Sequence, residues 1–182
     1  MSEQAALIGV VVVPLLGALA VMLAGSRPNL REAISLAAGV ILLALVVRLL
    51  PSALSGDWPA AVLAETIPGL SLAGSAEPLG VLFGLIASFL WIVTTVYSIG
   101  YMRGHGEAHQ TRFYTFFAVA MGCTMGVAFA DNLFTLFVFY EVLTLSTYPL
   151  VTHAGTQEAR QGGRTYLGIL MATSMGFLLL AV

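Results

Sequence analysis

The chain alternates between long apolar runs and short polar segments, and the runs are long enough to cross a bilayer. A helix that crosses the hydrocarbon core needs about 20 apolar residues. Six such runs occur at 5–25, 33–50, 78–102, 113–130, 132–152 and 165–182. Segment 51–77 is rich in Pro, Gly, Ser and Ala, holds three acids, and is predicted to be an external loop. The pattern predicts six transmembrane helices in a single domain, 1–182.

These runs are apolar at nearly every position and do not alternate with a period of two. Backbone groups inside lipid must satisfy their own hydrogen bonds, which leaves only helices or closed barrels. Barrel strands show segments of about 10 residues with alternating polarity. The pattern therefore predicts an all-α integral membrane protein. Glycine pairs such as Gly80/Gly84 and Gly122/Gly126 have the spacing that lets helices pack closely.

Composition narrows the classes of function that the chain can have. Of the 182 residues, 59% are hydrophobic and 9% are charged, whereas a soluble domain is about 25% charged. With a net charge of −2 and no lysine, the chain is expected to bind no nucleic acid. No catalytic, cofactor or metal site is predicted. Cys123 is expected to be a packing residue, and His105 and His109, which flank Glu107 in a glycine-containing loop, are expected to be solvated.

The arginines predict the orientation of the helices. Six of the seven lie in alternate connections: Arg27, Arg31, Arg103, Arg112, Arg160 and Arg164. Because basic residues of short loops stay in the cytoplasm, these connections are predicted to be cytoplasmic and the N-terminus external. The expected location is the inner (cytoplasmic) cell membrane. Segment 177–182 stops in apolar sequence, so we expect the chain to be the N-terminal part of a longer or split subunit.

One charge lies well inside an apolar run. Glu141 is nine residues past Asn132, or about 14 Å along a helix, which places it near the middle of the bilayer. An acid there costs on the order of 3 kcal/mol. Intramembrane carboxylates typically mark ion or proton paths, although a buried acid can also simply hold helices together.

Polar residues continue along the same helix face. Thr144, Tyr148 and Thr152 follow Glu141 at offsets of three, seven and eleven, and His153 stands beside the exit. They predict a wetted half-channel that ends at the carboxylate, with Glu141, Thr144, Tyr148, Thr152 and His153 as its residues. Hydroxyls in membrane helices usually bond to their own backbone, so the carboxylate carries most of this prediction.

Several sequence blocks point to a family. Tyr97–Met102 reads YSIGYM, and Ala130–Glu141 reads ADNLFTLFVFYE. Leu143–Val151 (LTLSTYPLV) and Gly163–Leu167 (GRTYL) follow. From about Tyr97 onward the chain resembles the antiporter-like family: proton-pumping membrane subunits of respiratory complex I, large subunits of Mrp-type cation/proton antiporters, and membrane subunits of hydrogenases. The later blocks are most similar to D-type antiporter subunits, although Tyr140 stands where a tryptophan is usual.

This resemblance implies an inverted-repeat bundle in which an acid on the fifth helix pairs with a lysine on the seventh. Glu141 matches that acid, and the chain contains no lysine to act as its partner.

Two functions remain open at this point. The first is a subunit of a multisubunit membrane complex that translocates protons, or exchanges them for sodium, driven by redox chemistry or by cation exchange. The second is a non-transporting helical scaffold that docks neighbouring membrane subunits. No cofactor is expected in this chain for either function.

Overall fold

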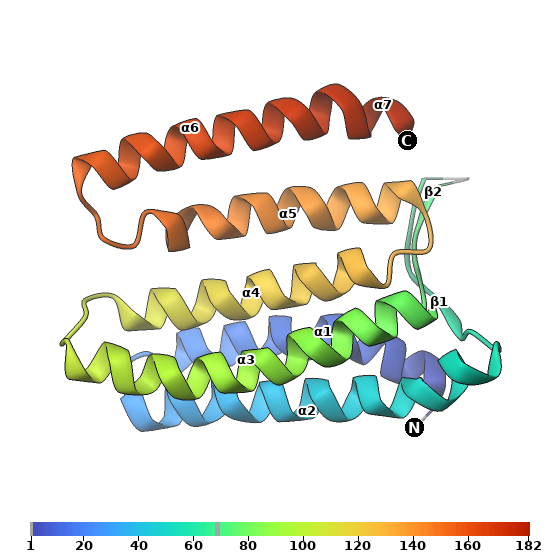
Figure 1. Cartoon of the computed structure of the whole chain (residues 1–182), viewed down its shortest axis with the longest axis horizontal. Helices are drawn as coiled ribbons and strands as arrows, with labels where there is room; N and C mark the ends of the chain where they lie inside the picture. The colour runs from blue at the N-terminus through green and yellow to red at the C-terminus, as the bar shows by residue number, and fades with distance from the viewer. Residues whose placement is uncertain (1, 68–69) are drawn as a thin grey trace.

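The computed structural model describes residues 2–67 and 70–182, and these form a bundle of six long helices (Figure 1). The helices are α1 (Glu3–Leu23), α2 (Pro28–Ser55), α3 (Pro78–Gly104), α4 (Gln110–Ala128), α5 (Leu133–Val151) and α6 (Gln157–Thr173). α6 continues through a π-helical turn, η1 (Ser174–Leu178), into the short α7 (Leu179–Ala181). The predicted all-α membrane class is confirmed.

Five of the described helices are long and apolar enough to span a membrane: α1, α2, α3, α5 and the continuous stretch Gln157–Ala181. α4 lies within the bundle but is not one of these five. Its first turn carries Gln110, Thr111 and Arg112, which lower its apolar content. The structure therefore contains the expected six helices, and five of them are candidate spans by length and composition.

The segment predicted as the loop 51–77 contains secondary structure. α2 extends through Ser55, and Ala60–Ile67 (β1) pairs antiparallel with Leu70–Ser75 (β2). The hairpin lies across one end of the bundle, near the start of α5 (Figure 1). Its second strand is fixed there because the backbone N–H of Ala73 donates to Oγ1 of Thr135 at 2.9 Å.

The starts of α5 and α6 carry ordinary side-chain caps. Oδ1 of Asn132 accepts a hydrogen bond from the N–H of Thr135 at 2.8 Å and so caps the start of α5. Oγ1 of Thr156 accepts from the N–H of Ala159 at 3.1 Å and starts α6 at Gln157, eight residues before the expected start at 165. The first two turns of α6 are therefore polar.

The hydrophobic core lies between the first four helices. Buried side chains such as Leu7, Val10, Leu42, Trp91 and Met125 fill it. α5 packs on α4, and α6 is the outermost helix, packed against α5 (Figure 1). The predicted polar face thus belongs to the outer layer of the bundle and lies away from this core.

Candidate functional site

Glu141 lies in the middle of α5, and this helix packs between α4 and α6 (Figure 1). Both of its carboxylate oxygens are buried, and neither has a hydrogen-bond partner among the described residues. Burying an unpaired carboxylate ion is costly, because it loses its hydration without compensation. A hydrogen-bond donor or a cation next to this carboxyl group would supply the partner that the described residues do not.

The half of the predicted polar face that follows Glu141 along α5 contacts α6. A Cβ atom placed on Gly163 of α6 would lie 3.2 Å from Cε2 of Tyr148 and would overlap the methyl group of Thr152. Thr144, one to two turns nearer to Glu141, is buried. The structure thus brings Tyr148 and Thr152 together against one glycine, in the interface between α5 and α6.

One hydroxyl group on this face donates its hydrogen bond to the helix backbone. Oγ1 of Thr152 donates to the carbonyl of Tyr148 at 2.9 Å. Within the described chain, no hydrogen bond joins Glu141 to the residues that follow it on this face. The continuous half-channel therefore stays a prediction.

His153 lies just beyond the end of α5 and contacts α4. Nη2 of Arg112 donates to the His153 carbonyl at 3.1 Å, and the imidazole meets the ring of Phe113 edge to face at 5.9 Å. Both ring nitrogens are buried without a partner in the described residues. Burial lowers the pKa of His153; Arg112 and His109 lower it further, while Glu107 opposes them. The neutral imidazole, which can accept and pass on a proton, is the favoured form.

Sequence reasoning missed a buried charge cluster at the same end of the bundle. Glu32 is 4% exposed, and its carboxylate pairs with both Arg31 and Arg103. Arg31 is also buried, donates to Oε1 of Gln110 at 2.8 Å, and lies over the ring of Tyr114. These arginines were predicted only as cytoplasmic loop residues, because Arg103 and Glu32 are 71 positions apart and the cluster forms only when they meet.

The structure also shows where Cys123 and His105 lie. Cys123 is buried, as a packing residue would be. Nδ1 of His105 lies 3.0 Å from the carbonyl of Tyr101, and its ring stacks on the Tyr101 ring. In the part of the chain that the structure describes, no three His, Cys, Asp or Glu side chains come together as a metal site would require.

Comparison with known proteins identifies relatives of part of this chain. It is 30% identical over 83 residues to the Na(+)/H(+) antiporter subunit A1 of Staphylococcus aureus strain bovine RF122 / ET3-1, and equally to that of strain JH9. The matched segment is 46% of this chain and 10% of the antiporter subunit. No family model matches the chain.

The fold has a counterpart among solved structures. A chain of the membrane-bound sulfane sulfur reductase (MBS), an archaeal respiratory membrane complex, superposes with a TM-score of 0.79 over 98% of this chain. The two sequences are 19% identical, so this match concerns the fold alone, and it covers 27% of the MBS chain.

Proposed function

Since part of this chain is homologous to a Na(+)/H(+) antiporter subunit, we propose that it belongs to a multisubunit membrane complex and takes part in proton translocation, with Glu141 as the protonatable group. The partners are other membrane subunits and the transported ions, protons alone or protons exchanged for sodium. The N-terminus is proposed to be external, in accord with the arginine distribution.

The observation that carries this proposal is the state of Glu141. Its carboxyl group is buried in a helix long and apolar enough to cross the membrane, and it has no hydrogen-bond partner in the described residues. A purely structural acid would gain stability from a donor within its own bundle. An unpaired one can change its charge when a cation approaches or withdraws.

The energies involved suffice for such a switch. A cation about 4 Å from the carboxylate stabilises the ionised form by roughly 4 kcal/mol at an effective dielectric constant near 20. Moving one charge against 100 mV requires about 2.3 kcal/mol. Displacing one cation beside Glu141 could therefore drive uptake and release of one proton. No lysine is present, so the cation would be an arginine of this chain or a group on a neighbouring helix or subunit.

The test is proton and sodium flux in vesicles that contain the complete complex. Glu141→Gln keeps the shape of the side chain but removes its titration, so the complex should assemble while coupled flux falls to that of empty vesicles. Glu141→Asp should retain part of the flux, limited by its shorter reach. Normal assembly with wild-type flux in Glu141→Gln would show that the acid only joins helices, and the scaffold function would replace this proposal.

A further inference from the structure

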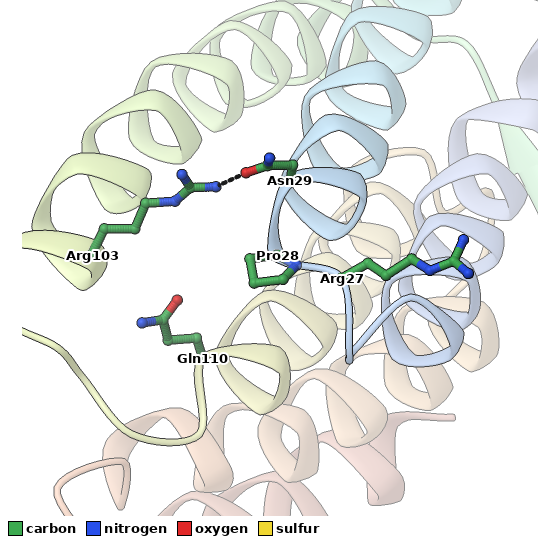
Figure 2. A pocket seen from close by; sticks show the side chains of 5 residues that line it. All are labelled: Arg27, Pro28, Asn29, Arg103 and Gln110. Carbon is green, nitrogen blue, oxygen red and sulfur yellow. Dashed lines mark hydrogen bonds between the residues drawn. The ribbon is translucent and has the colours of Figure 1, made fainter.

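An open pocket of about 530 Å³, lined mostly by charged and amide residues, lies where α2 begins and α3 ends, at the end of the bundle that carries most of the arginines. Its lining residues are Arg27, Pro28, Asn29, Arg103 and Gln110. Figure 2 shows Arg103 reaching across to Asn29, with Arg27 on the far side of Pro28. None of these residues takes part in the proposed Glu141 site.

The charges around this pocket leave it positive. Arg27 and Arg103 line it, and the buried Arg31, which donates to the lining residue Gln110, brings the number of guanidinium groups to three. The acid paired with them, Glu32, is buried and gives one carboxylate oxygen to both Arg31 and Arg103 and the other to Arg103. Glu32 offsets one of these three positive charges, so the four groups together keep a net positive charge.

Two of the guanidinium groups remain accessible. The Arg103 side chain is 46% exposed although it pairs with Glu32. Arg27 is exposed, and its side chain makes no hydrogen bond with any described residue. An anion in the pocket could therefore be bound by Arg103 where it stands and by Arg27 after rotation of its free side chain.

The backbone adds to this preference for an anion. Arg27 is the N-cap of α2 and makes no capping hydrogen bond, and Pro28 occupies the first turn. The start of a long helix carries partial positive charge and free N–H groups, which suit a phosphate oxygen. The side-chain amide of Gln110 is not counted as a donor to the anion, because its Nε2 already donates to the carbonyls of Met102 and Glu107.

The surroundings distinguish a lipid from a free ion. The pocket lies at the ends of α2 and α3, two helices long and apolar enough to span a membrane, and lipid headgroups flank the hydrocarbon core that such helices cross. Exposed apolar surface begins next to it, at Leu30 on α2 and Tyr101 on α3. We propose that this pocket binds the phosphate group of an anionic phospholipid, whose acyl chains lie along the exposed faces of α2 and α3.

The test measures lipid binding to the full chain in detergent micelles, by native mass spectrometry. The probes are phosphatidylglycerol, phosphatidylcholine with the same acyl chains, and inorganic phosphate as a competitor. Phosphatidylglycerol should bind saturably and more tightly than phosphatidylcholine, and inorganic phosphate should not displace it. Arg27→Gln should weaken phosphatidylglycerol binding about fivefold, the contribution of one arginine near a membrane surface.

Arg160→Gln is the matched control, because Arg160 is an exposed arginine on α6 at the same end of the bundle. It should leave phosphatidylglycerol binding unchanged. Equal losses in the two variants would mean a diffuse attraction to positive charge and would overturn the proposal, as would equal binding of the two lipids. Displacement by inorganic phosphate would identify a free-anion site in place of a lipid site. Circular dichroism of each variant confirms that it is folded.

Discussion

Glu141 and His153 are the two titratable residues between Leu133 and His153 whose side-chain polar atoms are buried without a partner in the described chain. They differ in position, because Glu141 lies within the membrane-spanning helix while His153 follows its end. Glu141 is conspicuous in the sequence as a charge inside an apolar run. The Arg112 contact of His153 could not be predicted in this way, because it joins residues 41 positions apart.

The lowered pKa of His153 predicts a pH dependence of stability. The unfolded chain binds more protons than the folded one between the folded pKa and the unperturbed value near 6.5. The contribution of His153 is therefore complete above about pH 6.5 and is lost as the pH falls through the folded pKa. His153→Asn should make the midpoint of unfolding depend less on pH across this window. His105→Asn serves as the control, and an unchanged pH profile in His153→Asn would contradict the assignment.

Tyr148→Phe tests the polar face at the level of one hydroxyl. If that hydroxyl helps to carry protons toward Glu141, its removal should lower flux about fivefold, equivalent to a hydrogen bond of ~1 kcal/mol. Thr144→Val should cause a loss of flux similar to that of Tyr148→Phe, and both losses should be smaller than the loss in Glu141→Gln. Thr165→Val, an exposed hydroxyl on α6, is the matched control. Flux in Tyr148→Phe equal to that of the control would remove this face from the pathway.

At the scale of elements, the packing of α5 on α6 depends on Gly163. A side chain there would overlap Thr152 and press on Tyr148, whereas the neighbouring Gly162 faces open space. Gly163→Val should therefore lower the stability by about 1–3 kcal/mol, the usual cost of overpacking. Gly162→Val introduces the same residue at the adjacent position and should cost much less. The measurement is thermal unfolding of the two variants. Equal destabilisation by Gly163→Val and Gly162→Val would contradict the close packing of α5 on α6 at Gly163.

The helices could be predicted from the sequence because each contains a long apolar run, and in all but α4 the helix is long and apolar enough to span a bilayer. The hairpin Ala60–Ser75 could not, since its strands are rich in Ala, Ser and Gly and are held by distant groups such as Thr135. The polar start of α6 was missed for a related reason. Residues 157–164 look like a loop by hydropathy, and only the Thr156 cap shows that the helix begins there.

At the scale of the whole molecule, the connections rich in arginine lie at the end of the bundle opposite the hairpin (Figure 1). This arrangement predicts that Glu107 faces the cytoplasm and Asp57 the outside. In a Cys123→Ala background, an impermeant thiol reagent added to intact cells should label Asp57→Cys but not Glu107→Cys. Labelling of position 107 from outside would show that the orientation is the opposite of the predicted one.

The central claim is that Glu141 gains and loses a proton when the complex transports ions. Infrared difference spectroscopy of the complete complex in vesicles, recorded with and without an imposed proton gradient, observes the carboxyl group itself. The wild-type complex should show a change in the C=O band of a protonated carboxyl that is missing in an assembled Glu141→Gln complex. The same band change in both complexes would contradict the account.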